Sequence, residues 1–337
     1  MDGSILLSLI GIIAALCLLV VLIMKGVNIF IVALLCSSIV ALTGGLNLYE
    51  GLKVNYMTSF VNFFKSNFLI FLTGTIMGKA YEITNGAKSI AKMIVNKFGP
   101  NMALISIPLA CGIISYGGVS VFVASFAVFP IALEVFRQAD YPRKFIPGAL
   151  TFGCSTWAMV APGAPQIHNA VPAQVLGTDL MAGSVNGFIS CAVILLLGSF
   201  ILIKTVNNAR NRGEGFVPKP MDVFHDDAIY PSGYLALIPL FFTLFLINFK
   251  VGGTPILPLE FGVFIGALAV IILLNKYQDN GKLIHHLGEA CKQSVVSISN
   301  TCAVVGFGGV VQASLAFPTI INAMVSIPGP PLAGVAI

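Results

Sequence analysis

Long apolar runs alternate with short polar connections along most of the chain. Each run is continuously apolar over about 20 residues, which fits a helix that crosses a bilayer and does not fit the alternating strands of a membrane barrel. The pattern therefore predicts a bundle of membrane-spanning helices. The predicted spans are residues 5–24, 28–46, about 58–78, 181–203, about 234–249, about 257–274, and a last one from near Ala290.

One apolar run, residues 101–136, is too long for a single span. It has no charge before Glu134, and the polar hexapeptide SYGGVS, residues 115–120, interrupts it. A single helix would be about 54 Å long, whereas the hydrocarbon core is about 30 Å thick. The run therefore predicts two helices joined at the glycines, either as two short crossings or as a re-entrant hairpin that enters and leaves on one side.

A second interruption follows, in a segment that begins near Phe145. Its residues 161–174, APGAPQIHNAVPAQ, contain three prolines and a glycine. Proline lacks the backbone N–H, and its ring clashes with the preceding turn, so a helix does not continue through such a segment. We therefore predict a broken helix here.

Two segments lack the character of a span. Residues 83–101 place Lys88, Lys92 and Lys97 between apolar positions, which predicts a short amphipathic helix lying in the membrane interface. Residues 204–233 form the only long polar stretch and are predicted to link two halves of the protein.

The composition agrees with this pattern. Of the 337 residues, 57% are hydrophobic and 9% charged, and the mean hydropathy is +0.95, whereas a soluble domain carries about 25% charged residues. These values indicate an integral membrane protein and exclude a soluble enzyme. The net charge of +5 requires no nucleic-acid partner, because the basic residues fall in loops. The seven cysteines lie mostly in apolar runs without a CxxC pair, which predicts small buried residues and no disulfide framework or metal site.

The distribution of the basic residues favours the re-entrant hairpin. If the N-terminus is outside and residues 101–136 return to the inside, all 18 lysines and arginines except Lys53, Lys65 and Lys250 lie inside. A single full crossing would invert every later loop and remove this bias, whereas cytoplasmic loops normally hold the excess of basic residues. Two full crossings would give the same sidedness, although about 15 apolar residues per arm is short for a crossing.

The predicted topology contains an inverted repeat. The segment KSNFLIFLTGT (65–75) resembles ISNTCAVVGFGG (298–309), and FGPNMALISI (98–107) resembles PGPPLAGVAI (328–337). Inverted repeats with broken helices at mid-membrane are typical of secondary transporters. The second copy stops before a second hairpin and a second broken helix, so we expect a C-terminally truncated chain. The predicted domains are a complete first repeat at 1–203, a cytoplasmic linker at 204–233 and an incomplete second repeat at 234–337.

The tip of the predicted hairpin is the first candidate for a substrate site. Its residues are Ser115, Tyr116, Gly117, Gly118 and Ser120. Backbone N–H groups freed at the turn, together with opposed helix ends and serine hydroxyls, suit a carboxylate. The alternative is a close helix–helix packing site, which also favours small residues.

The break supplies the second candidate, with Pro162, Gly163, Gln166, His168 and Asn169. The amides and the imidazole can form hydrogen bonds with hydroxyls or carboxylates. His168 changes charge near neutral pH, which allows a role in proton coupling; the alternative is a structural hydrogen bond at the helix end.

A third polar group in an apolar stretch comprises Ser299, Asn300 and Thr301, for which close packing and contact with substrate both remain open. The counterpart of this group in the first half, residues 73–75, is interpreted in the same way.

The acidic residues Glu82 and Glu134 lie three residues from Lys79 and Arg137, which predicts ion pairs at span ends. The chain contains no P-loop, HExxH or GxSxG motif and no paired catalytic carboxylates. We therefore expect neither an enzyme nor a metal centre.

The segments YGGVSVFVASFAVFPIALEVF and APGAPQIHNAVPAQVLGT together resemble the gluconate permease (GntP) family of the ion transporter superfamily, over about residues 28–337. The resemblance implies a multi-pass inner-membrane symporter that takes up gluconate, related sugar acids or 3-hydroxybutyrate with protons. It also implies a hairpin tip and a helix break that form the site, here residues 115–120 and 162–169, and a homodimer by superfamily analogy. Sugar-acid members tend to carry a His-Pro-Gly type of segment, whereas PGAPQIH is nearer to the branch for smaller hydroxy acids.

Taken together, we expect an all-α polytopic membrane protein, an inverted-repeat transporter with a re-entrant hairpin and a broken helix. The expected function is proton-coupled uptake of a small organic acid anion, without a cofactor. The alternatives are a sodium-coupled symporter or an antiporter, and a membrane subunit that transports nothing. The expected partners are the organic acid anion and the lipid bilayer, and no nucleic acid.

Overall fold

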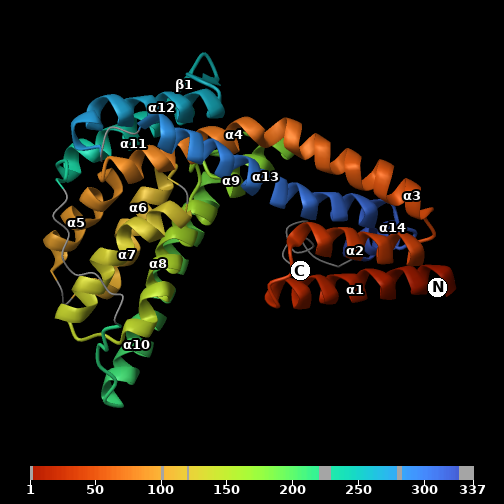
Figure 1. The fold of residues 1–337 in the computed structure, drawn as a ribbon, viewed down its shortest axis with the longest axis horizontal. Helices are drawn as coiled ribbons and strands as arrows, with labels where there is room; N and C mark the ends of the chain where they lie inside the picture. The colour runs from red at the N-terminus through yellow and green to blue at the C-terminus, as the bar shows by residue number, and fades with distance from the viewer. Residues whose placement is uncertain (1–2, 100–101, 120, 220–228, 279–282, 326–337) are drawn as a thin grey trace. The chain divides into compact units, whose positions relative to one another are not determined.

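The computed structural model describes residues 3–99, 102–119, 121–219, 229–278 and 283–325. The described residues are mostly helical, and a short β-hairpin of β1 (Lys250–Val251) and β2 (Thr254–Pro255) connects two of the helices (Figure 1). The helices are α1 Gly3–Met24, α2 Ile29–Thr43, α3 Leu48–Glu50, α4 Met57–Ile83, α5 Gly86–Phe98, α6 Ala103–Tyr116, α7 Val121–Gln138, α8 Ile146–Ser155, α9 Ile167–Leu176, α10 Ser184–Asn211, α11 Gly233–Asn248, α12 Leu259–Leu274, α13 Leu283–Ala313 and α14 Phe317–Val325.

The chain divides into two compact units. The terminal unit comprises Met1–Phe68 and Val295–Ile337, and the central unit comprises Leu69–Ser294. Helices α4 and α13 each begin in one unit and end in the other. These units are defined by compactness, whereas the predicted inverted repeat concerns symmetry between the two halves of the chain. The boundaries of the repeat therefore stay a prediction.

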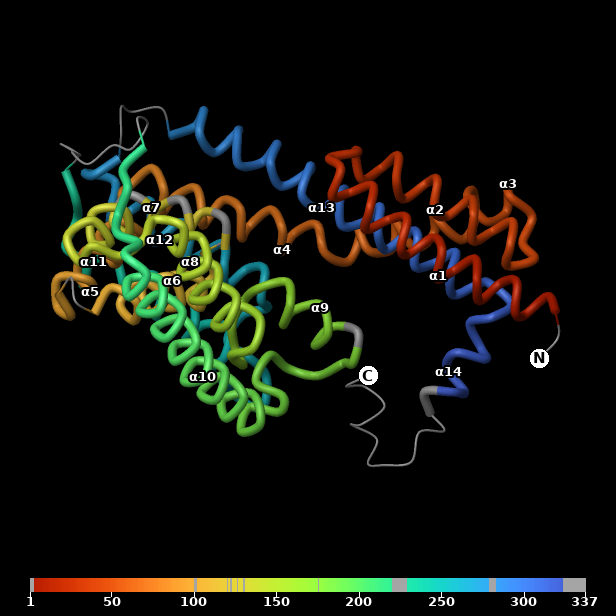
Figure 2. The backbone as a smooth tube through the Cα atoms, turned by 90° about the horizontal axis from the view of Figure 1, so that it is seen from below, coloured from red at the N-terminus to blue at the C-terminus, as the bar shows by residue number. Residues whose placement is uncertain are grey.

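The terminal unit is built by close contacts between α1, α2 and the C-terminal part of α13, which lie side by side in Figure 2. A Cβ added at Gly11 would lie 1.9 Å from Thr43 Oγ1, so α1 and α2 touch through glycine. Gly306 of α13 gives the same close approach to the Tyr56 ring, at 2.8 Å. Lipid offers apolar side chains no gain from burial, so helices in a membrane associate through such close packing.

The central unit packs α5, α6, α7, α8, α11 and α12 around one another, and Figure 1 shows α6, α7 and α8 side by side. Gly153 of α8 lies directly against α6, where an added Cβ would be 2.2 Å from the Pro108 carbonyl oxygen. Buried Tyr81 joins α4 to α11 by donating its hydroxyl proton to the Ala236 carbonyl at 2.9 Å.

The described helices confirm an all-α polytopic membrane protein. Five of them are long and apolar enough to cross a membrane. The exposed side of α10 is apolar over most of its length, which fits contact with lipid and not with water. Its exposed apolar side chains include Val185, Phe188, Ile189, Leu196, Leu197, Phe200 and Ile201.

Several elements differ in extent from the sequence prediction. Helix α5 is amphipathic as predicted. Its apolar residues Ile90, Ala91 and Ile94 are buried by protein, however, because α5 packs on α6, α7 and α11. Helix α10 continues to Asn211, eight residues into the predicted linker. The last predicted span starts earlier, since α13 begins at Leu283.

Cysteine burial agrees with the prediction of small buried residues. The buried thiols are Cys36, Cys111, Cys154, Cys191 and Cys302, whereas Cys17 is exposed and Cys291 is half-buried. All seven are free thiols.

Candidate functional site

The interrupted run at 101–136 forms two helices with a glycine turn between them, as predicted. Helix α6 has 14 residues and is therefore about 21 Å long, less than the hydrocarbon thickness. Gly118 has φ +103°, a conformation that glycine adopts without strain. A Cβ at Gly118 would lie 3.0 Å from Pro165 Cγ, so the turn presses directly on the broken helix.

Ser115, at the end of α6, is fully buried. Its hydroxyl lies within hydrogen-bond distance of two carbonyl oxygens, Gly112 at 3.1 Å and Cys154 at 3.2 Å. The second contact ties the hairpin to α8. The neighbouring Gly117 faces α11, where an added Cβ would lie 2.4 Å from Leu240 Cδ2.

Tyr116 connects the hairpin to the break in two ways. Its hydroxyl donates to the Pro162 carbonyl at 2.8 Å, and its ring meets Trp157 edge to face at a centroid distance of 5.9 Å. Trp157 packs against α6, where a Cβ at Gly112 would lie 2.1 Å from its ring. The indole Nε1 is buried and has no hydrogen-bond partner among the described residues.

The predicted break lies where the sequence places it, but it is narrower. Helix α8 passes into a π-helical turn, Thr156–Val160, and the chain leaves the helix at Ala161, with ψ 125°. Helix α9 resumes at Ile167 and tolerates Pro172 inside it, so the prediction that the irregular stretch extends to Gln174 is wrong. A proline removes only one backbone donor, and a short exposed helix retains its other bonds. Residues 161–166 form the actual break.

Gln166 joins the break to the tip of the hairpin. Its Nε2 donates to the carbonyl oxygens of Ser115 at 2.9 Å and Val119 at 3.0 Å. The Ser115 carbonyl, near the end of α6, also accepts from the Gly118 N–H at 3.1 Å, whereas the Val119 carbonyl belongs to the turn. One carboxamide therefore satisfies the end of one helix from the start of another.

The other polar residues of the break differ in environment. Asn169 donates from Nδ2 to the Ala161 carbonyl at 2.9 Å and to the Ala164 carbonyl at 3.4 Å, so its amide closes the break on itself. His168 is exposed in the first turn of α9. Contact of these residues with a substrate stays a prediction.

Gly163 is held from two sides. Its N–H donates to the Leu180 carbonyl at 2.8 Å, and its carbonyl accepts from Asn248 Nδ2 at 3.0 Å. Gly163 has φ +79°, and a Cβ there would lie 2.6 Å from Met181 Sδ and 3.0 Å from Asn248 Oδ1. Any other residue at this position would be strained and would displace both neighbours.

An exposed ion pair lies next to this arrangement along the chain. Lys250 Nζ is 2.6 Å from Asp179 Oδ2, and these residues are close neighbours of Asn248 and Leu180 respectively. The hydrogen bond from Lys250 lowers the pKa of the Asp179 carboxyl below its ordinary value. The pair connects the loop after α9 to the β-hairpin after α11.

The electrostatics of the site follow from two helix starts. Helix α7 begins just after Val119 and α9 just after Gln166, and these two residues are in contact. The first N–H groups of each helix lack an intrahelical acceptor, and a helix N-terminus carries about half a positive charge. Two such ends meet at the hairpin tip in a largely apolar unit.

The remaining predicted site residues are not brought into this arrangement. Ser120 lies outside the described residues. Ser299, Asn300 and Thr301 lie in the terminal unit, where Thr301 Oγ1 donates to its own helix at Ser297 O, 3.1 Å. Thr73 and Thr75 of α4 likewise donate to carbonyls four residues earlier, at 2.9 and 2.6 Å.

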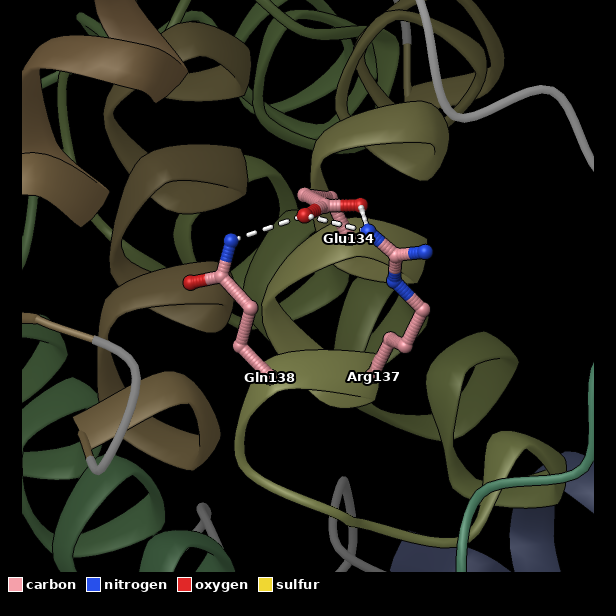
Figure 3. A network of polar contacts seen from close by, with 3 residues as sticks. All are labelled: Glu134, Arg137 and Gln138. Atoms are coloured by element: carbon pink, nitrogen blue, oxygen red, sulfur yellow. Dashed lines mark hydrogen bonds and ion pairs between the residues drawn. The ribbon is translucent and has the colours of Figure 1, made fainter.

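The predicted ion pairs are confirmed. Lys79 Nζ lies 2.6 Å from Glu82 Oε1, and Arg137 lies 2.9 Å from Glu134 Oε2. Gln138 adds a hydrogen bond of 2.8 Å to Glu134, which completes the small network on α7 in Figure 3. Glu134 and Arg137 lie at the C-terminal end of α7, away from the hairpin tip at its start.

The fold and the hairpin define a class of protein: a polytopic α-helical membrane protein whose helices break inside an apolar unit, as secondary transporters do. The family model of the GntP family permease matches residues 7–327, and the chain belongs to this family. The family is one of permeases, which are membrane transporters rather than enzymes.

Two relatives are similar to the chain. It is 30% identical over 298 residues to the uncharacterized transporter YxjC of Bacillus subtilis (strain 168), covering 77% of this chain and 62% of the relative. It is 28% identical over 218 residues to an uncharacterized transporter of Haemophilus influenzae, covering 63% of this chain and 50% of the relative. The chain thus spans between half and two thirds of the length of these relatives.

Sequence reasoning missed two residues of this site. Asn248 ends an apolar helix far along the chain, and Trp157 lies in the π-helical turn just before the break. The signal for Asn248 was an amide closing an otherwise apolar span, next to the Lys250 that breaks the basic pattern. Its contact with Gly163, 85 positions away, has no local trace in the sequence.

Proposed function

We propose that the protein takes up a small hydroxylated carboxylate across the inner membrane together with protons. The observation that carries the proposal is the contact between the hairpin tip and the helix break, made by Gln166. A helix break inside an apolar unit costs backbone hydrogen bonds, and transporters retain such breaks where a substrate binds. A membrane subunit without transport would gain nothing from it.

The hairpin tip supplies the carboxylate end of the site. The N-terminal turns of α7 and α9 begin side by side and present backbone N–H groups with partial positive charge. No lysine or arginine side chain is needed there, because fixed dipoles stabilise an anion in a low-dielectric site. The site residues proposed from the sequence at 115–120 and 162–169 keep this assignment.

His168 is our candidate for the coupling proton. It is exposed in the first turn of α9, close in sequence to Gln166, which contacts the tip. Histidine changes charge between about pH 5 and 8, so a proton taken up there neutralises part of the substrate's charge during transport. Sodium coupling is the alternative outcome of the experiment below.

The proposed sidedness is supported by the ion pairs. Lys144 pairs with Glu214, and both belong to loops that the charge pattern assigns to the cytoplasm. Asp179 pairs with Lys250, and both belong to loops assigned to the outside. A topology in which either pair was divided by the membrane would be inconsistent with these contacts. A homodimer of the protein remains part of the proposal by analogy with the superfamily.

Uptake of radiolabelled 3-hydroxybutyrate and gluconate into right-side-out vesicles tests the proposal. We expect uptake of 3-hydroxybutyrate that rises with an inward proton gradient and collapses when a protonophore is added. The variant H168A should retain binding but lose the response to the gradient. Uptake that is insensitive to the protonophore and requires sodium would show that the transporter is coupled to sodium and not to protons. If neither acid is taken up, the proposed class of substrate is wrong.

A further inference from the structure

The carboxamide oxygen of Asn248 is a buried acceptor that lacks a partner. Asn248 ends α11 and faces the break, and its Oδ1 has no hydrogen-bond partner among the described residues. Buried polar atoms are normally paired, and an exception calls for a ligand, a water or a functional role. The atom therefore marks a place where a donor is missing.

The orientation of this carboxamide is fixed by its nitrogen. Nδ2 donates to the Gly163 carbonyl at 3.0 Å and to the Leu244 carbonyl at 3.1 Å. Both hydrogens of the amide are used, and exchanging nitrogen and oxygen would place the oxygen against two carbonyl oxygens. The unpartnered atom is therefore the oxygen, and a carboxylate cannot satisfy it.

Gly163 places this oxygen at the break. Oδ1 lies 3.0 Å from the position that a Cβ on Gly163 would take. The preceding residue, Pro162, accepts the hydroxyl proton of Tyr116 at 2.8 Å, so the same short segment contacts the hairpin on one side and Asn248 on the other. The segment therefore lies between the hairpin and Asn248, and a ligand that displaces it can reach both.

We propose that Asn248 Oδ1 accepts the hydroxyl proton of the bound acid and so selects hydroxylated over unsubstituted carboxylates. The inference rests on the proposed function, since it assigns a residue to the site described there. The acid's carboxylate lies at the helix starts, and a hydroxyl, the one donor in the case of 3-hydroxybutyrate, meets Asn248 Oδ1, which is an unpaired acceptor among the described residues of the break. The oxygen is covered in this conformation, so the bond forms when the Gly163 segment shifts around the ligand.

The proposed hydrogen bond predicts a ratio of affinities for two acids and not merely an affinity for one. A site that forms a hydrogen bond with a substrate hydroxyl discriminates strongly against the analogue that lacks it, because the buried protein atom is then left unpaired. We expect the unmodified protein to bind 3-hydroxybutyrate at least about tenfold more tightly than butyrate. A residue with only a structural role would affect both acids equally.

Isothermal titration calorimetry with 3-hydroxybutyrate and butyrate on the purified protein tests this. The variant N248L removes the acceptor and should bring the two dissociation constants to within about twofold of each other. The control is N67L, because Asn67 also donates to the carbonyl four residues earlier, Phe63 at 2.9 Å, and should leave the ratio unchanged.

Each outcome decides the inference. If N248L weakens both acids alike and the ratio persists, Asn248 is structural and the inference is overturned while the proposed function stands. If the unmodified protein binds both acids equally tightly, the inference is likewise overturned while the proposed function stands. If it binds neither acid, the proposed function is overturned as well. Should N248L fail to fold, N248A removes the same acceptor with a smaller side chain and the ratio is measured there.

Discussion

At the scale of single residues, the site depends on glycines and amides that occupy positions no other side chain can fill. Gly118 turns the hairpin at positive φ, and Gly163 lies between Met181 and Asn248. Gln166 then donates to the Ser115 and Val119 carbonyls at the turn. Each of these roles is conformational first, and the binding of an anion follows from the backbone groups that they expose.

A series of glycine-to-alanine variants separates strain from collision. G118A introduces both backbone strain and a close contact with Pro165, and we expect it to lower the free energy of unfolding by about 1–3 kcal/mol. G177A, at φ +64° with open space around it, should show strain alone, at about 1 kcal/mol. G148A, in α8 with nothing within 4 Å, should be neutral or slightly stabilising. Thermal unfolding in detergent gives the order, and equal losses for all three would contradict the account.

At the scale of elements, the hairpin and the broken helix behave as one assembly held by side chains from both. We expect Q166L to remove both hydrogen bonds of the Gln166 amide, to leave the Val119 carbonyl without this donor, and to cost about 1–3 kcal/mol. The control is Q138L, which removes one exposed hydrogen bond to Glu134 and should cost less than about 1 kcal/mol. Chemical denaturation measures both, and equal effects would show that the contact at the tip contributes nothing special.

The ion pair between Asp179 and Lys250 adds a pH dependence. The folded state lowers the pKa of Asp179, so the pair stabilises the protein above the ordinary carboxyl pKa of 3.8 and the contribution disappears as the pH falls through the lowered value. Both side chains are about 40% exposed, which limits the contribution to less than about 1 kcal/mol.

The measurement compares D179N with the unmodified protein across this range. The variant should have the lower melting temperature at pH 7, and the difference should vanish in strong acid. A difference that persists at a pH well below the lowered pKa, where the carboxylate is protonated in both states, would mean that Asp179 acts through its shape or its hydrogen bond to Met181 and not through its charge.

How far sequence could predict these elements depends on the range of each contact. The apolar runs, the interruption at Gly117–Gly118 and the break after Val160 follow from local residue types, and the structure has all three. The contacts of Gln166 with the tip and of Asn248 with Gly163 join residues 47 to 85 positions apart, so no local pattern predicts them. The return of helix at Ile167 was also missed, because proline frequency outweighed the single bond that Pro172 removes.

At the scale of the whole molecule, the charge pattern predicts which loops share a side of the membrane. Single cysteines at exposed Asn211, the last residue of α10, and at exposed Thr254, in the β-hairpin, should lie on opposite sides. In a background whose native cysteines are replaced by alanine, a membrane-impermeant maleimide should label T254C in intact cells and N211C only after permeabilisation. Labelling of both from one side would contradict the re-entrant topology.

The central claim is that a hydroxy acid binds between the hairpin tip and the helix break, and Trp157 tests it most directly. Trp157 is the only tryptophan of the chain and lies in the π-helical turn before the break, edge to face with Tyr116. Titration with 3-hydroxybutyrate should shift its emission in a saturable way, with a midpoint equal to the calorimetric dissociation constant, and W157F should remove the signal while binding continues. Calorimetric binding with unchanged Trp157 emission would place the substrate elsewhere and contradict the account.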